Sequence, residues 1–86
     1  MRIEFKRQFL KRYAKAPSPI RVKCDERIRL FAGEPNHPVL NNHSLGGDRL
    51  GKWSINITGN WRTLYEFVDE NTVVFVEIGT HPYLYG

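Results

Sequence analysis

The spacing of apolar residues changes near the start of the chain. Residues 2–5 alternate polar and apolar side chains, as a short strand does. Aromatic residues then recur at every fourth position from Phe5 to Tyr13, as on one face of a helix. The pattern predicts a brief strand followed by a helix over residues 6–16. Prolines at 17 and 19 end that helix, because the residue before a proline is pushed out of the α region.

A second helix is predicted from Ser18 to Gly33. Ser18 is a good N-cap, Pro19 suits the first helical position, and Gly33 is a typical C-terminal stop. Four apolar residues share one face of this helix: Ile20, Cys24, Ile28 and Phe31. We therefore expect the two helices to form a basic hairpin with an apolar seam.

The remaining residues predict a loop and a small sheet. Residues 34–51 are rich in Pro, Asn, His and Gly, which is typical of a long connecting loop. Three segments rich in aromatic and β-branched residues follow, at 53–58, 61–67 and 72–78, and predict a three-stranded antiparallel meander. The expected architecture is α+β, one domain over residues 1–86, with the helices packed on one face of the sheet.

Charge is distributed unevenly between the two parts of the chain. Residues 1–31 hold ten basic and three acidic side chains, a balance of +7, whereas residues 32–86 have a balance of −3. A basic segment of this kind favours nucleic acid or an acidic protein as a partner. A solvated helix face is the alternative interpretation.

The cysteine content and the length of the apolar runs exclude disulfide-rich, zinc-cysteine and membrane-spanning proteins. Cys24 is the single cysteine, so neither an intramolecular disulfide nor a cysteine zinc cluster can form, and a reducing cytoplasm is the expected location. The longest uninterrupted apolar run covers residues 73–76, far short of a membrane span, so no membrane association is expected.

Candidate chemistry lies at the ends of the predicted strands. The sequence has no phosphate-binding Gly-rich loop and no closely spaced metal-binding histidine pair, so neither a cofactor nor a metal is expected. Residues 60–62 and 79–85 would instead bring a histidine, an arginine and tyrosines together beside the sheet. Attack of an RNA 2′-hydroxyl on its phosphodiester needs a base, a cation and an acid, which such a set supplies. Taken singly, His81 is also typical of a capping residue, and Arg62 of a surface ion pair.

Three motifs in this order resemble the RelE/ParE superfamily of bacterial toxins, most closely the YafQ-type messenger-RNA interferases. They are Asn-His-Ser-Leu at 42–45, Trp-Ser-Ile-Asn-Ile-Thr-Gly-Asn-Trp-Arg at 53–62, and Ile-Gly-Thr-His at 78–81 with Leu-Tyr at 84–85. The resemblance covers nearly the whole chain and implies a RelE-like fold. The second strand is also similar to the HigB branch, so the assignment within the superfamily stays open.

The resemblance implies roles for particular residues. His81 matches a principal acid/base residue, and His43 matches a second histidine that would transfer protons. Arg62 matches the arginine that acts on the scissile phosphate. Trp61 and Tyr85 match aromatic residues that would stack on or position the substrate.

Three positions depart from the YafQ pattern. Asn60 replaces an aspartate and cannot act as a base, although it stays a candidate for binding substrate. Asn56 replaces a histidine, and Glu77 replaces an arginine and would repel phosphate if it faced the site. These departures leave it open whether the site is fully active.

The implied function is a cytoplasmic, ribosome-dependent and metal-independent endoribonuclease that cleaves messenger RNA and is neutralised by a cognate antitoxin. The antitoxin would also carry the toxin–antitoxin complex to operator DNA. The alternative is a family member without nuclease activity, either a toxin acting on DNA gyrase as the ParE branch does or a degenerate protein that binds an antitoxin. The codon preference and the antitoxin cannot be inferred from the sequence.

Overall fold

The computed structural model describes residues 1–85. A mixed sheet with the strand order β1-β5-β4-β3-β2 forms its centre, in which β1 runs parallel to β5 and the other neighbours are antiparallel. The elements in chain order are β1 (Arg2–Phe5), α1 (Arg7–Lys15), α2 (Ser18–Gly33), the 3₁₀ turn η1 (Pro38–Leu40), β2 (His43–Ser44), the 3₁₀ turn η2 (Gly47–Arg49), β3 (Trp53–Asn56), β4 (Trp61–Asp69), β5 (Thr72–Thr80) and α3 (His81–Tyr85).

The larger core lies between the sheet and the α1–α2 hairpin. Phe31 is buried on α2, with its ring centroid 4.8 Å from that of Tyr65 and 5.7 Å from that of Phe75. Phe9 of α1 joins the same aromatic cluster. Cys24 is also buried here, and desolvation raises the pKa of its thiol to about 12. Apolar residues of both predicted helices therefore belong to one core that packs against the sheet.

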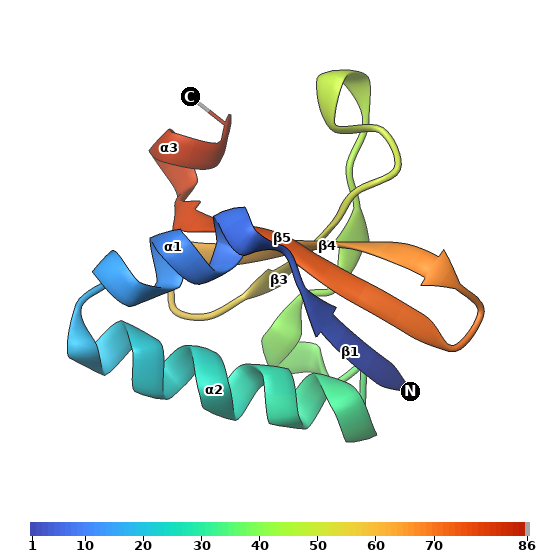
Figure 1. Ribbon diagram of the computed structural model, residues 1–86, viewed down its shortest axis with the longest axis horizontal. Helices are drawn as coiled ribbons and strands as arrows, with labels where there is room; N and C mark the ends of the chain where they lie inside the picture. Colours follow the sequence, from blue (N-terminus) through green and yellow to red (C-terminus); the bar gives the residue numbers. More distant parts are fainter. Residues whose placement is uncertain (86) are drawn as a thin grey trace.

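The opposite face of the sheet carries a smaller apolar cluster beneath α3. Leu64, Val76 and Leu84 are buried together there. In Figure 1, α2 lies below the sheet, whereas α3 and the projecting loop that contains η2 rise above it. The two faces of one sheet thus differ in what covers them.

Several details differ from the sequence-based expectation. The region 34–51 is not a structureless loop but contains η1, β2 and η2, which are too short to produce a periodic pattern. The last described residues form α3, so the helices cover both faces of the sheet rather than one. Pro17 rather than Ser18 is the N-cap of α2, and no side chain caps that terminus.

The sheet also has one strand more than predicted, because β2 adds to the edge of β3 through two residues. The α+β class and the order of strand, helical hairpin and meander are confirmed. Among residues 1–85, no helix combines the length and the apolar character that a membrane crossing requires.

Candidate active site

The segment Gly79-Thr80-His81 turns the chain from β5 into α3. A Cβ atom at Gly79 would lie 2.6 Å from the Tyr83 ring, so a larger residue would push the helix away. The Thr80 hydroxyl accepts a hydrogen bond from the Tyr83 amide at 3.3 Å, as a helix N-cap does. The backbone amide of His81 donates to the Asn60 carbonyl at 2.8 Å. Each residue of the motif therefore helps to fix α3 against the sheet.

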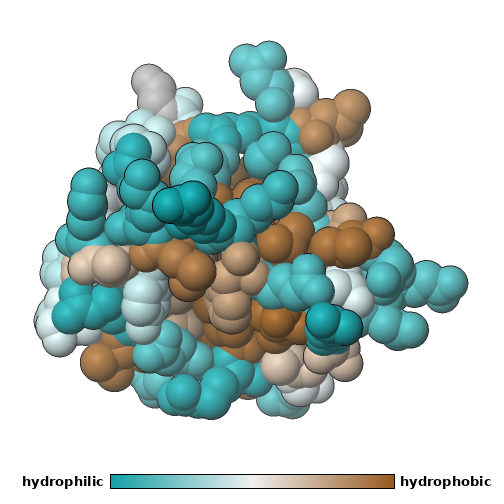
Figure 2. All heavy atoms as spheres, viewed as in Figure 1, coloured by the Kyte–Doolittle hydropathy of each residue, from teal (hydrophilic) through white to brown (hydrophobic). Residues whose placement is uncertain are grey.

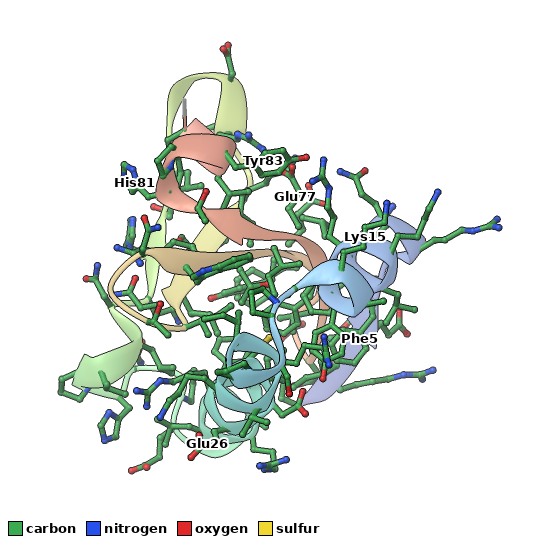
Figure 3. The ribbon with its side chains drawn as sticks, turned by 90° about the vertical axis from the view of Figure 1, so that its left-hand side faces the viewer. Phe5, Lys15, Glu26, Glu77, His81 and Tyr83 are labelled. Atoms are coloured by element: carbon green, nitrogen blue, oxygen red, sulfur yellow. The ribbon has the colours of Figure 1, made fainter. Side chains whose placement is uncertain are left out.

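His81 and Tyr85 lie one helical turn apart on α3. Their ring centroids are 4.7 Å apart, and the Tyr85 hydroxyl donates to Ser54 Oγ at 3.0 Å. Ser54 is fully buried on β3. Figure 3 shows that His81 and Tyr83 leave α3 toward different sides. One side of this short helix therefore carries His81 and Tyr85, the two residues of α3 that the sequence analysis predicted for the site.

His43 reaches the same place from the other edge of the sheet. It is paired with Ser54 in the β2–β3 register, so both side chains lie on the face that α3 covers. His43 Nδ1 lies 2.7 Å from the carbonyl oxygen of Asn41. Because a carbonyl only accepts, Nδ1 carries the proton, and Nε2 of the neutral ring is left to accept one.

The third histidine, His37, has a different role. Its Nδ1 accepts a hydrogen bond from the Val39 amide at 3.1 Å and caps η1. Its contacts are those of a structural residue.

Arg62 is held by the turn between β3 and β4. Its Nη1 donates to the carbonyl oxygens of Thr58 at 2.8 Å, Gly59 at 3.1 Å and Trp61 at 3.2 Å. Within residues 1–85 the side chain is thus held by backbone oxygens, and no acidic side chain of this range pairs with it, so the interpretation of Arg62 as half of an ion pair finds no support there.

A cavity of about 290 Å³ brings four of the six sequence-predicted residues together. Its walls are formed by Asn41, His43, Leu45, Arg62, His81 and Tyr85. Two imidazoles and a guanidinium around one space can supply a base, an acid and a cation to a single phosphodiester.

Trp61 and Asn60 lie outside this cavity. Trp61 packs partly against the larger core and lines a separate cleft of about 160 Å³ with Arg12, Lys15 and Tyr83. Asn60 is exposed in the β3–β4 turn, where its backbone, rather than its side chain, contacts the start of α3. The structure does not group these two side chains with the histidines.

Glu77 lines a larger cavity next to the first, and Tyr85 borders both. This second cavity has a volume of about 810 Å³ and is bordered by three basic and three acidic side chains, namely Lys6, Arg49, Lys52, Asp48, Glu66 and Glu77. Glu77 forms an ion pair with Arg49 and does not line the cavity that holds the histidines, so the condition under which it would repel phosphate is not met. Sequence reasoning missed both Arg49 and Ser54. Arg49 belongs to none of the three motifs, and Ser54 lies in the motif at 53–62 but has no role implied by the resemblance.

Asn56 stands beside Arg62 in the β3–β4 register, on the face that forms the cavity. Its Oδ1 is buried and has no hydrogen-bond partner within residues 1–85. No group of three or more His, Cys, Asp or Glu residues suited to a metal ion occurs in the same described range.

Solved structures with the same fold cover the whole of the chain. Escherichia coli YafQ superposes with a TM-score of 0.83 at 23% identity, covering 100% of each chain. The YoeB/ParE toxin from Agrobacterium tumefaciens superposes with a TM-score of 0.76 at 20% identity, over 94% of this chain and 99% of that one. This chain has the RelE-like fold that these two proteins share.

The toxin in the Escherichia coli DinJ–YafQ toxin–antitoxin complex has the same RelE-like toxin fold. It superposes with a TM-score of 0.80 at 24% identity, over 98% of this chain and 96% of that one. That toxin is bound to its antitoxin, DinJ.

Sequence comparison finds one similar curated protein, the endoribonuclease HigB of Proteus vulgaris. The two are 38% identical over 42 residues, which are 49% of this chain and 46% of HigB. The chain thus aligns with about half the length of this relative. No family model matches the sequence.

Proposed function

We propose that this protein with the RelE-like toxin fold is the toxin of a bacterial type II toxin–antitoxin system, and that it is an endoribonuclease cleaving messenger RNA. The observation that carries the proposal is the cavity shared by His43, His81, Arg62 and Tyr85. The similarity to a segment of the endoribonuclease HigB supports the same reaction class.

The proposed reaction is transfer of the scissile phosphate to the adjacent 2′-hydroxyl. His43 Nε2, left unprotonated by the contact of Nδ1 with Asn41, removes the proton from the 2′-hydroxyl. A protonated His81 donates its proton to the leaving 5′-oxygen. The O2′–P bond forms as the P–O5′ bond breaks, which gives a 2′,3′-cyclic phosphate and a 5′-hydroxyl. The two imidazoles supply both proton transfers, so the reaction as written needs no metal.

Arg62 would stabilise the phosphorane-like transition state in which the O2′–P bond forms and the P–O5′ bond breaks. Its Nη1 is engaged by the β3–β4 turn, which fixes the guanidinium before substrate arrives. Tyr85 would stack on a base or support the His81 ring, which it already contacts. Trp61 and the exposed Asn60 would act outside the cavity, on the flanking RNA or on the ribosome.

Dependence on the ribosome follows from the proposed division of roles. Asn60 cannot serve as a base, and both histidines are exposed to solvent, so the reaction would rely on correct positioning of the RNA. Correct alignment supplies a large part of the rate enhancement in reactions of this kind. The basic residues of α1 and α2 would bind ribosomal RNA while the ribosome presents the message.

A cognate antitoxin is the proposed protein partner in the cytoplasm. Solved toxins of this fold are bound to DinJ and to YefM. Figure 2 shows apolar side chains between α1 and α2 amid hydrophilic ones, where Phe5, Leu10 and Ile28 line a cleft of about 320 Å³. An acidic amphipathic segment would match this surface, and the antitoxin would carry the complex to operator DNA.

The alternative is a protein without nuclease activity, either a toxin acting on DNA gyrase or a degenerate antitoxin-binding protein. The observation that favours it is Asn56, which replaces a histidine of the YafQ pattern on the sheet face beside Arg62 and whose buried Oδ1 has no hydrogen-bond partner among residues 1–85. Induced expression of wild type and of His81→Ala, followed by primer-extension mapping of transcripts, separates the two.

Our proposal expects cuts inside translated codons with the wild type and none with His81→Ala. If the messages stay intact and DNA damage that depends on gyrase appears, the nuclease proposal is rejected in favour of the alternative. Antitoxin binding by His81→Ala should equal that of the wild type, because His81 is exposed and no part of the core depends on its ring.

A further inference from the structure

The helix that carries His81 and Tyr85 cannot stabilise itself. α3 has five residues, and an isolated helix of that length does not form in water. Its position therefore depends on contacts with its surroundings. The buried Leu84 side chain and the hydrogen bond from Tyr85 to Ser54 hold it on the sheet.

Arg49 provides a further contact from outside the sheet. This residue lies in η2, in the loop that rises above the same face as α3 (Figure 1). One nitrogen of its guanidinium pairs with Glu77 on β5, and the other donates to the carbonyl oxygen of Leu84. The Arg49 side chain thus connects the loop that contains η2 with Glu77, which lines the larger cavity, and with the last turn of α3.

The geometry around Arg49 restricts its motion. Its side chain is 30% exposed and that of Glu77 is 17% exposed, so the pair is largely shielded from water. A planar guanidinium held at two nitrogens has a fixed orientation, which a single ammonium group does not. The Leu84 carbonyl belongs to the last turn of the helix, where backbone oxygens lack a helical partner.

We propose that Arg49, oriented by Glu77, is a positioning residue that sets where α3 places His81 and Tyr85 in the cavity. Its effect on cleavage rests on the proposed endoribonuclease function, whereas its effect on the two rings does not. Arg49 is not a catalytic residue, because its charge is taken up by Glu77 and its second nitrogen by the helix.

Lys52 offers a matched control. It lines the same cavity and forms an ion pair with Glu66 at 3.2 Å, with 27% of its side chain exposed. Lys52→Ala therefore removes one positive charge and one partly shielded ion pair from the same surface. The hydrogen bond to the Leu84 carbonyl comes from Arg49, whereas the ion pair of Lys52 is with Glu66 on β4, so Arg49→Ala removes this support of α3 and Lys52→Ala leaves it in place.

The test compares ring signals of His81 and Tyr85 by NMR in the free wild type, Arg49→Ala, Arg49→Lys and Lys52→Ala. We expect Arg49→Ala to displace both signals and Arg49→Lys to displace them in the same direction by less. Lys52→Ala should leave both signals at their wild-type positions. If Arg49→Ala does not fold, Arg49→Lys is judged against Lys52→Ala by the same criterion.

Ribosome-dependent cleavage is then measured on the same proteins. A misplaced His81 should lower kcat about 10²-fold with little change in KM for Arg49→Ala, whereas Lys52→Ala should leave kcat unchanged. Ring signals of the Arg49 variants that match the wild type, or move no more than those of Lys52→Ala, would overturn the proposal. If the ring signals of the Arg49 variants are displaced but the wild type cleaves no RNA, the positioning role of Arg49 stands and the proposed nuclease activity is rejected.

Discussion

The two faces of the sheet are built by different kinds of interaction. On the α1–α2 face, buried aromatic rings contact one another, with Phe31 and Phe75 both at or below 1% exposure. On the α3 face, three buried aliphatic residues are surrounded by ion pairs and polar contacts, among them Arg49–Glu77 and Lys52–Glu66. The α1–α2 face contributes the larger part of the hydrophobic stabilisation, because that contribution scales with buried apolar area and the larger cluster lies there.

This difference explains why the candidate site lies where it does. The α3 face is only partly covered, and His43 and His81 are exposed there. The desolvation penalty for titratable groups at such positions is small. The same groups inside the aromatic core would need partners for every polar atom. We therefore expect that stability and the proposed activity can be changed separately, each by substitutions on one face.

The largest effect on stability is expected from Phe31→Ala. Removing a buried phenyl ring leaves a cavity and should lower the free energy of unfolding by about 3–5 kcal/mol. Phe67→Ala is the matched control, because the same truncation at a ring that is 51% exposed should cost roughly 1 kcal/mol. Urea denaturation measures both.

Cleavage per folded molecule should remain that of the wild type in both variants. A selective loss of cleavage in Phe31→Ala, measured where it is fully folded, would show that the two faces are not independent.

The apolar face was the more predictable of the two from sequence. Three local signals in the sequence predicted it: the four-residue spacing of aromatic side chains in α1, the prolines at 17 and 19, and the β-branched residues of the strands. The structure has the helix, the break after it and the strands. The pairing of β1 with β5 was not predictable, because the partners lie about seventy residues apart and share no local pattern. The spacing of the aromatic side chains predicts which side of α1 packs on the sheet. The register of β1 against β5 depends on packing in three dimensions.

On the α3 face, most of the residues that line the cavity could be selected from the sequence, but their arrangement could not be predicted. His43, Arg62, His81 and Tyr85 were all selected from motifs and share one cavity. Trp61 was selected for the same site and lies in another cleft, because its position in β4 turns it toward the α1 side. Arg49 gave no signal, since its role depends on a three-dimensional contact with the end of α3.

The next largest effect is expected from Arg62. A guanidinium that stabilises the phosphorane should make Arg62→Ala about 10²- to 10³-fold slower than the wild type. Arg62→Lys should retain part of the rate, because it keeps the charge but loses the planar fork. Loss of the contacts with the turn should change stability by only about 1 kcal/mol, since water replaces Nη1 at carbonyls near the surface.

Thermal melts run beside ribosome-dependent cleavage assays separate the two roles of Arg62. A large fall in Tm with unchanged cleavage per folded molecule would make Arg62 a purely structural residue of the β3–β4 turn.

A smaller effect is expected on antitoxin binding. Residues 1–31 carry a balance of +7, so an acidic partner on the α1–α2 surface should bind more weakly as salt increases. Titration calorimetry from low to high salt, with Lys52→Ala as a control on the opposite face, measures this dependence. An affinity that stays constant across the salt range would indicate an apolar contact and leave the basic surface to the ribosome.

The most direct test of the account is the chemistry of the cut ends. Messenger RNA cleaved on ribosomes by the purified protein is recovered, and the 5′ end of the downstream fragment is tested for phosphorylation by a polynucleotide kinase without prior phosphatase treatment. Transfer to the 2′-hydroxyl by His43 and His81 predicts a free 5′-hydroxyl, which the kinase labels at once, and no product from His81→Ala. Downstream fragments that carry a 5′-phosphate, or equal cleavage by His81→Ala, would contradict the proposed site.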